Sequence, residues 1–225
     1  MLAAGKVNAM QETTPLNDSL RERICFIGDV FGPLFLYEPS SDATRELYET
    51  LAAMDVRAAA EDWPFVSLDS AQPLLERIQG ALGSSSEEDL LWEYRRLFVG
   101  PARKAAPPWG SVYLDKDQVI FGLSTLDLRQ WMRENGIAKT TEDGDPEDHI
   151  GRMLLLMSWL SENEPEALPA FLQDHLLTWA PHFLQVVSRE TEGDFFAALA
   201  QLCEASLEGM REELALTVPP VKFYR

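Results

Sequence analysis

The chain has 225 residues, with 19 Lys and Arg against 37 Asp and Glu, which gives a formal net charge of −18 at pH 7. A field of this sign repels the phosphates of DNA, RNA and anionic lipids, so a nucleic-acid partner is excluded and a cationic partner is favoured. The hydrophobic fraction of 46% indicates a globular protein with a sizeable core, and the length allows one large domain or two small ones.

The cysteine content and the N-terminal sequence predict a cytoplasmic location. Cys25 and Cys203 are the two cysteines of the chain, and residues 1–23 contain no apolar stretch that could form a signal-peptide core. The densest apolar runs are short or are interrupted by Asp29, whereas a membrane span needs about 18 uninterrupted apolar residues. The sequence therefore predicts a protein that is not integral to a membrane.

The N-terminal part begins with a polar segment. Residues 1–17 predict a mobile leader that ends at a cap signal around Asn17. A helix is expected from there to Glu38, because apolar side chains recur with a period near 3.6. Pro33 lies inside this range and predicts a bend or an interruption.

Two shorter helices are expected next. Residues 41–54 carry an apolar stripe and predict the first of them. Residues 61–73 contain two prolines and predict a connector. The second helix is expected after Pro73, with its end at Gly80 or Gly83.

The clearest helix start lies at residues 84–89, where three serines precede three carboxylates. Ser85 and Glu88 have the spacing of a capping box, and negative charge is favourable at the positive end of the helix dipole. The helix is expected to continue to the Gly100-Pro101 pair.

Residues 103–123 show no helical period, and Pro107 and Pro108 favour an extended backbone. Residues 112–121 could form a small hairpin, but two short strands alone are marginal in water. An extended loop pinned by aromatic side chains is therefore the favoured structure.

The next helix is expected from a cap at Ser124 or Thr125 to the Asn135-Gly136 pair. Residues 139–145 contain no apolar side chain and predict a hinge linker. A further helix is expected to start with Asp145 as its N-cap and Pro146 at its first position.

The C-terminal part predicts further helices over residues 168–177, 182–189 and 194–214, followed by a tail from Val218 to Arg225. The predicted fold is an all-α, globular multi-helix bundle. Its expected parts are a helical part over 18–138, the hinge over 139–145 and a helical part over 146–225, together in one compact domain.

Motifs of nucleotide-binding loops and metal sites do not occur in the sequence. It contains no G-x-x-x-x-G-K-[ST], no G-x-G-x-x-G, no H-E-x-x-H and no C-x-x-C. Pro181 separates His175 from His182, so a shared helix face is not expected. Both cysteines lie in apolar or mixed helical stretches, which favours buried and unreactive thiols. We therefore expect no metal and no cofactor.

Three other groups of residues are open to two interpretations. Asp148 and His149 follow Pro146 as ordinary residues of a helix start, or they present two polar contacts to a ligand at the helix end. The loop around Trp109 fills the core or forms the wall of a groove for an apolar peptide. The same alternative holds for Tyr94, Leu97 and Phe98, and residue physics favours the core for each.

Several sequence blocks, in order, resemble a known family. They are YRRLFVGP at 94–101, PPWGSVY at 107–113, FG at 121–122, STL at 124–126, LR at 128–129, WMR at 131–133 and PEDH at 146–149. This order is similar to the TorD/DmsD/NarJ family of twin-arginine signal-peptide chaperones, and most similar to its DmsD branch. That branch often has Trp where this chain has Tyr94 and Ala102.

The resemblance implies an all-helical, non-enzymatic chaperone of the cytoplasm. Such a protein would bind the leader of a molybdopterin oxidoreductase precursor, of the dimethyl sulfoxide reductase type, and hold back its export until the cofactor is inserted. It implies the Tat translocase as a further partner. The implied peptide-binding residues are Tyr94, Leu97, Phe98, Pro107, Pro108, Trp109, Gly122, Pro146, Asp148 and His149.

Physical features agree with this hypothesis, and two alternatives stay open. A twin-arginine leader combines a basic start with an apolar stretch, so its receptor needs negative potential beside an apolar surface. A hinge before Pro146 would allow a domain-swapped dimer as well as a monomer. The alternatives are a small acidic helical enzyme, such as a nucleotide hydrolase, that uses Asp148 and His149 as acid and base, and a helical scaffold without leader recognition.

Overall fold

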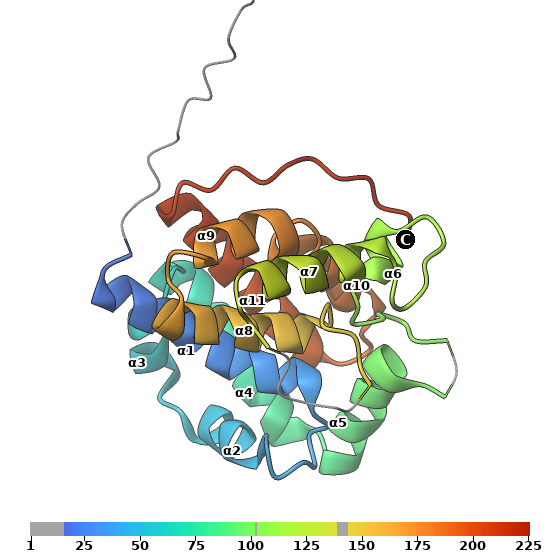
Figure 1. Cartoon of the computed structure of the whole chain (residues 1–225). Coiled ribbons are helices and arrows are strands. Elements are labelled where there is room, and N and C mark those ends of the chain that lie inside the picture. Colours follow the sequence, from blue (N-terminus) through green and yellow to red (C-terminus); the bar gives the residue numbers. More distant parts are fainter. Residues whose placement is uncertain (1–15, 102, 139–143) are drawn as a thin grey trace, which may run out of the picture.

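The computed structural model describes residues 16–101, 103–138 and 144–225, and every regular element in these ranges is a helix (Figure 1). Within them, one antiparallel bridge joins Trp109 to His149. The predicted all-α class is therefore confirmed. Most of the predicted leader and hinge, residues 1–15 and 139–143, lies outside the described residues. The elements are α1 (Asp18–Leu36), α2 (Arg45–Ala53), α3 (Val56–Asp62), α4 (Leu68–Ser84), α5 (Glu87–Tyr94), η1 (Arg95–Val99), α6 (Ser111–Leu114), α7 (Leu123–Glu134), α8 (Ile150–Asn163), α9 (Leu168–Phe171), η2 (Leu172–Leu176), α10 (Ala180–Glu190) and α11 (Asp194–Glu213).

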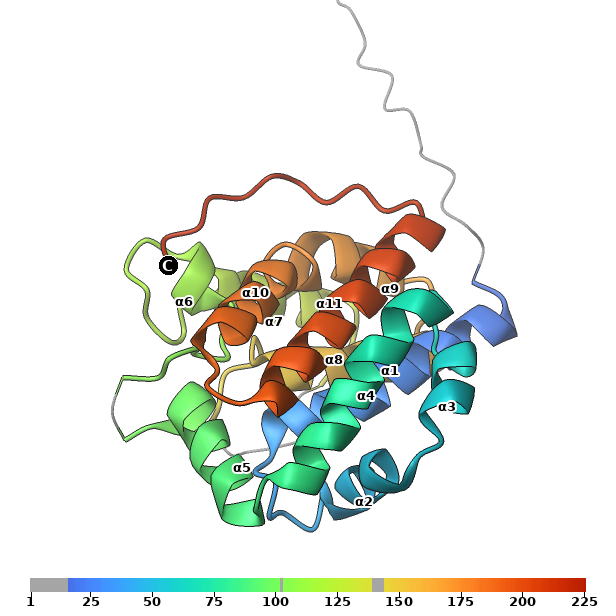
Figure 2. The same cartoon turned by 180° about the vertical axis from the view of Figure 1, so that it is seen from behind.

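One helix pair and one group of three helices form the centre of the fold. Helix α1 lies along α8, and α11 packs against α4 and α10 (Figures 1 and 2). Helix α1 starts where its sequence predicts, because the Asn17 side chain accepts a hydrogen bond from the Leu20 N–H at 2.9 Å. Pro33 is accommodated within α1, which ends at Leu36.

The α1–α8 pair is unusually close because glycines lie at the contact. A Cβ on Gly28 would be 2.5 Å from the Leu154 carbonyl oxygen, and one on Gly151 would be 2.6 Å from the Gly32 carbonyl oxygen. Small residues let two helix backbones approach, and the gain is close packing along both helices. This contact fixes the position of the start of α8, which is part of the site described below.

Two expected helix starts in the N-terminal part were wrong. Helix α2 starts only at Arg45, because residues 38–44 form turns that the Thr44 hydroxyl holds by a 2.9 Å bond to the Glu38 carbonyl oxygen. The predicted connector over 61–73 is short, since α4 already starts at Leu68 and includes Pro73. Burial of the apolar face of α4 against α11 outweighs the hydrogen bond that proline removes.

The next helix has a capping box one residue later than expected. Ser86, not Ser85, is the N-cap of α5, and Asp89 completes the box in place of Glu88. The α-helix ends at Tyr94, and the five residues of η1 continue as a π-helical turn up to Gly100, which has a φ of 103°. The expected stop at Gly100 is confirmed.

Residues 111–114 are helical, so neither the hairpin nor the fully extended loop is correct for this segment. The ring of Tyr113, which is fully buried, stacks on Trp179 at 5.9 Å between centroids. Anchoring of this aromatic residue in the core outweighs the weak helical signal of the local sequence, as tertiary context commonly does.

Two expected helix starts are also corrected. Helix α7 begins at Leu123 after Gly122, so neither Ser124 nor Thr125 is its N-cap. Helix α8 begins at Ile150 with His149 as N-cap, not with Asp145 as N-cap and Pro146 at its first position.

In the C-terminal part, the helix expected over 168–177 is divided into α9 and the π-helical η2. Helices α10 and α11 agree with their predicted ranges to within two residues. The expected separation of His175 and His182 is confirmed, because the two residues lie in η2 and α10.

Candidate functional site

The candidate site is built on two irregular segments that hold each other. The Gly110 N–H donates to the Asp148 carbonyl oxygen at 3.0 Å, and the Ile150 N–H donates to the Pro108 carbonyl oxygen at 2.8 Å. Pro107 and Pro108 favour an extended first segment, so that Trp109 can form an isolated antiparallel bridge with His149. This pairing is the reason that α8 starts at Ile150.

Six of the implied binding residues lie in these two segments, and their side chains are largely buried. Trp109 is 9% exposed, and its ring meets the His149 ring edge to face at 5.7 Å. Gly122 is half-buried at the start of α7, where a Cβ would lie 1.8 Å from an Asp115 carboxylate oxygen. The six are Pro107, Pro108, Trp109, Pro146, Asp148 and His149.

Tyr94, Leu97 and Phe98 lie in the hydrophobic core, at most 3% exposed. The Tyr94 hydroxyl donates to the Phe35 carbonyl oxygen at 3.1 Å, and Phe98 packs against Phe35 at 5.9 Å between ring centroids. Contact of these three side chains with a peptide stays a prediction. The Leu97 carbonyl oxygen accepts a hydrogen bond from the Ala106 N–H at 3.0 Å, which joins this part of the core to the chain that leads to the Pro107 segment.

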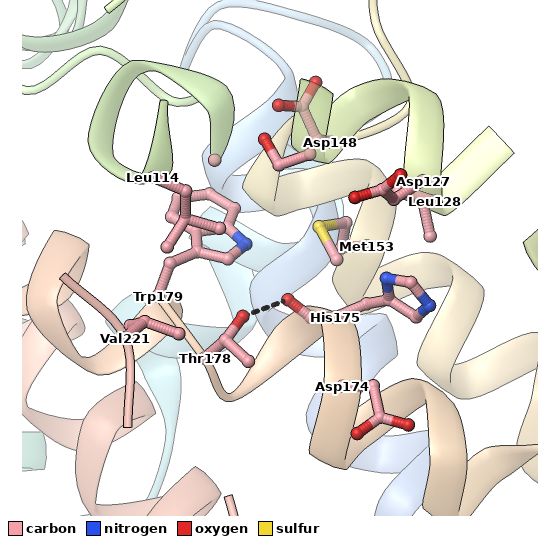
Figure 3. A pocket seen from close by; sticks show the side chains of 12 residues that line it. Leu114, Asp127, Leu128, Asp148, Met153, Asp174, His175, Thr178, Trp179 and Val221 are labelled. Atoms are coloured by element: carbon pink, nitrogen blue, oxygen red, sulfur yellow. Dashed lines mark hydrogen bonds between the residues drawn. The ribbon is translucent and has the colours of Figure 1, made fainter. Parts of the chain in front are cut away.

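A pocket of about 200 Å³ opens between α6, α7, η2 and the start of α8 (Figure 3). Three carboxylates from three different elements border it, those of Asp127, Asp148 and Asp174. We call it the acidic pocket. Its complete lining is Gly110, Leu114, Ser124, Asp127, Leu128, Asp148, Met153, Asp174, His175, Thr178, Trp179 and Val221.

Asp148 is the buried carboxylate of the acidic pocket, with 2% of its surface exposed. Its Oδ2 accepts a hydrogen bond from the Ser111 N–H at 2.7 Å, while its Oδ1 has no hydrogen-bond partner among the described residues. Burial raises the pKa of Asp148 above the usual carboxyl value, although the Ser111 hydrogen bond acts in the opposite direction. An unpartnered buried oxygen is suited to accept a hydrogen bond from a ligand.

Asp148→Asn is expected to stabilise the free protein. The raised pKa means that charging this carboxyl destabilises the folded state as the pH rises through the folded pKa, so a neutral amide should increase the free energy of unfolding at pH 7. The amide oxygen can still accept from the Ser111 N–H. Urea unfolding at pH 7 and at pH 4 measures the gain, which should shrink at pH 4; a variant less stable than the wild type at pH 7 contradicts the interpretation.

His149 has a structural role at the start of α8. Its Nδ1 accepts a hydrogen bond from the Gly151 N–H at 3.2 Å, as an N-cap side chain does. Burial, with the nearby Arg152 charge, lowers the pKa of His149 to about 3. The ring is therefore neutral at pH 7, and it does not reduce the negative charge of the acidic pocket.

His175, at the opposite side of the pocket, is also neutral at pH 7. Burial lowers its pKa, while the charges of Asp174 and Asp127 act in the opposite direction. Its carbonyl oxygen accepts from the Thr178 hydroxyl at 2.8 Å, which fixes the turn that carries Trp179 (Figure 3). The charge inside the pocket thus comes from its carboxylates.

An exposed apolar loop lies beside the acidic pocket. It consists of the side chains that connect α6 to α7 and begin α7, and Leu123 is 71% exposed. Arg129 lies over the Phe121 ring at 5.1 Å and is paired with Glu147, so this cation is already neutralised. We call the loop the apolar loop; its members are Val119, Ile120, Phe121, Leu123 and Leu126.

The sequence did not single out Asp127, Asp174 or the apolar loop. In a chain with 37 acidic residues, two more aspartates carry no distinguishing signal. The two come together only because α7 and η2 border the same cavity. Val119, Ile120 and Phe121, three adjacent apolar residues before Gly122, were the available signal for the loop, and they were interpreted as a hairpin strand or an extended loop.

A metal site, a reactive cysteine and a membrane span find little support in the described ranges. No group of three potential metal ligands occurs among these residues. Burial raises the pKa of the Cys25 thiol to about 11, and it also raises the pKa of the Cys203 thiol well above its usual value, so neither is an activated nucleophile. Among the helices of the described residues, none combines the length and apolar character of a membrane span.

The comparisons with known proteins agree with the fold. The model of the nitrate reductase delta subunit family matches residues 67–185. A Tat proofreading chaperone DmsD from Salmonella typhi is 40% identical over 91% of this chain and 97% of that protein. A chaperone protein TorD from Aliivibrio fischeri is 26% identical over 86% of this chain and 93% of its own length.

A solved structure has the same fold. It is that of an Archaeoglobus fulgidus protein described as a redox enzyme maturation protein, with a TM-score of 0.53 and 20% identity over 88% of this chain and 99% of that chain. The relatives are named chaperones, which confirms the prediction of a non-enzymatic protein and leaves the hydrolase alternative without support. By the family model and these identities, the chain belongs to the nitrate reductase delta subunit family, in the branch of the Tat proofreading chaperone DmsD.

Proposed function

We propose that this protein is a cytoplasmic chaperone that binds the twin-arginine signal peptide of a molybdopterin oxidoreductase precursor of the dimethyl sulfoxide reductase type. It would retain the precursor until the enzyme has matured. The observation that carries the proposal is the acidic pocket beside the apolar loop, because a leader of this class presents a basic start followed by an apolar stretch. The family relationship supports the same function.

The acidic pocket has the chemistry of a guanidinium site. A guanidinium group donates several hydrogen bonds from one plane and pairs bidentately with carboxylates. Asp127 and Asp174 are exposed at the rim, and Asp148 provides the unpartnered Oδ1. The Trp179 ring lines the same cavity, and arginine stacks on aromatic rings. The volume of about 200 Å³ suits a side chain inserted from an extended peptide.

The apolar loop would receive the apolar stretch of the leader. It adjoins the pocket directly, since Ser124, Asp127 and Leu128 of α7 line the pocket while Leu123 and Leu126 of the same helix belong to the loop. Exposed apolar clusters of this kind commonly mark binding surfaces. A leader that places its paired arginines in the pocket could therefore continue along the loop.

The double variant Asp127→Asn with Asp174→Asn tests this assignment. We expect it to bind a purified twin-arginine leader about tenfold or more weakly, because two partners of the guanidinium are lost. Isothermal titration calorimetry at several salt concentrations measures the affinity, which should fall with salt for the wild type and less steeply for the variant.

The matched control is Asp69→Asn with Glu76→Gln on α4, which removes the same charge away from the pocket. Equal loss in both variants would mean that overall charge, not the acidic pocket, attracts the leader. No binding of any reductase leader from the same genome to the wild type would refute the function. A scaffold without leader recognition would instead co-purify with the mature partner.

A further inference from the structure

The segment 216–225 follows α11 as an extended strand-like tail and runs along the edge of the molecule to α6 (Figures 1 and 2). We call it the tail strap. Val221 from this segment is one of the residues that line the acidic pocket. The tail strap thus already occupies part of the surface that the proposed function assigns to the leader.

The tail strap is anchored at its far end. The Tyr224 N–H donates to the Tyr113 carbonyl oxygen at 2.9 Å, and the Gln118 side-chain amide donates to the Tyr224 carbonyl oxygen at 2.5 Å. Gln118 directly precedes the apolar loop, and Tyr113 lies in α6. The anchor therefore joins the tail strap to both sides of the proposed binding surface.

Arg225 and Phe223 add contacts at the same end. The Arg225 guanidinium donates to the carbonyl oxygens of Lys104 and Ala105 at 2.9 and 3.1 Å, immediately before the Pro107 segment. The Phe223 ring stacks on the His182 ring at 4.0 Å between centroids. These contacts resemble those expected of a bound peptide: an arginine on backbone carbonyls and an aromatic ring on a ring of the protein.

The middle of the tail strap is held weakly. Pro219 and Pro220 have no N–H to donate, and residues 218–223 make no hydrogen bond to any other described residue. The side chains from Pro219 to Lys222 are exposed. Segments with few buried contacts open at a free-energy cost well below that of global unfolding.

The tail strap also has the same chemistry as the proposed ligand. It combines Lys222 and Arg225 with Val221, Phe223 and Tyr224, that is, cationic groups among apolar ones. Such a segment is attracted by the same negative potential as a leader. Two segments of this kind cannot both occupy the rim of one small pocket.

We propose that the tail strap is an intramolecular occupant of the leader-binding surface, which an arriving leader must displace. The inference rests on the proposed function. In most free molecules the tail strap then lies on the binding surface, and only molecules in which it is released can bind a leader. The apparent affinity for a leader is therefore the intrinsic affinity multiplied by the released fraction. Release would remove Val221 from the lining of the pocket that also contains Asp148 and Trp179.

The double variant Phe223→Ala with Arg225→Ala loosens the tail strap without altering the pocket. It removes a ring contact and two hydrogen bonds of a charged group, so we expect it to bind a twin-arginine leader about threefold to tenfold more tightly by calorimetry. The control is Phe223→Ala with Arg45→Ala, which gives the same change of charge but keeps the Arg225 bonds; it should gain less.

Hydrogen exchange provides a second measurement on the wild type. The Tyr224 amide, bonded to Tyr113, should exchange faster when leader is added, whereas bound proteins usually show slower exchange. Weaker leader binding by the double variant would contradict the proposed role of the tail strap. An unchanged exchange rate of the Tyr224 amide in protein saturated with leader would contradict it as well. Either result leaves the proposed function intact. If neither the wild type nor the variants bind a leader, the proposed function is wrong. The proposed role of the tail strap is then wrong too, because it rests on that function.

Discussion

Gly28→Val is expected to destabilise the protein by about 3 kcal/mol or more, which is a large fraction of the stability of an ordinary domain. A Cβ at this position would lie 2.5 Å from the Leu154 carbonyl oxygen and 2.7 Å from the Ser158 Cβ. Neither atom belongs to the end of a flexible side chain, so α1 and α8 would have to separate. Urea or thermal unfolding of the variant measures the loss.

Gly80→Ala is the matched control for this prediction. Gly80 is an exposed residue of α4, and no heavy atom lies within 4 Å of a Cβ placed there. Because alanine is the better helix former, this variant should gain up to about 1 kcal/mol. If Gly28→Val and Gly80→Ala had similar effects, the close approach of α1 and α8 would not be a determinant of the fold.

The α1–α8 contact also affects the candidate site, because α8 begins directly after the segment 146–149 that forms part of this site. A variant such as Gly28→Val that stayed folded at low temperature should move the start of α8 relative to the Pro107 segment. Weaker leader binding by the folded fraction would follow from this displacement and not from any lost contact with the ligand.

His149→Asn is expected to remove most of the acid sensitivity of the protein between pH 6.5 and pH 4. The folded-state pKa of about 3 lies below the usual 6.5, so the neutral ring stabilises the fold above pH 6.5 and that contribution is lost as the pH falls toward 3. At about 1.4 kcal/mol per pH unit, the loss from pH 6.5 to pH 4 is on the order of 3 kcal/mol. Asparagine does not titrate and is a good N-cap.

The slope of the unfolding free energy against pH is the quantity to compare, because the smaller asparagine loses the ring contact with Trp109 and lowers stability at every pH. Titration of Asp148 changes the unfolding free energy in the opposite direction. Because Asp148 is present in both the wild type and the variant, its contribution cancels in the difference between the two slopes. Equal slopes for wild type and variant between pH 6.5 and pH 4 would show that protonation of His149 does not open the start of α8.

His149 and Asp148 also show why their adjacent placement does not make an acid–base pair. The two side chains have different partners, Gly151 for the histidine ring and Ser111 for the carboxylate. One therefore caps α8, and the other borders the acidic pocket. Their separate roles agree with a binding protein of the chaperone family and not with the enzyme that sequence reasoning kept as an alternative.

Much of the fold follows from local sequence. The period of apolar residues predicts α1, α7, α8 and α11, and Asn17 and the Asn135-Gly136 pair mark helix ends because their side chains or backbone satisfy terminal groups locally. Such signals act within one turn of helix. They need no information about the rest of the chain, and for this reason they predicted the all-α class correctly.

The candidate site, in contrast, is formed by the segments between helices and by the packing of helices that are far apart in the sequence. Residues 146–149 have the local sequence of a first helical turn, yet Glu147 and Asp148 form a separate turn and His149 pairs with Trp109, so that α8 begins only at Ile150. Asp127 and Asp174 are ordinary surface acids in the sequence and become neighbours of one cavity only through the packing of α7 and η2.

The sequence alone thus determined the helical class, the negative charge and the family to which the chain is similar, because composition, periodicity and motif order are properties of the chain itself. Only the tertiary structure decided that Asp127, Asp148 and Asp174 border one pocket, that Tyr94, Leu97 and Phe98 fill the core, and that Val221 of the tail strap lines the acidic pocket. These features depend on contacts between residues far apart in the chain, and local sequence patterns do not predict such contacts.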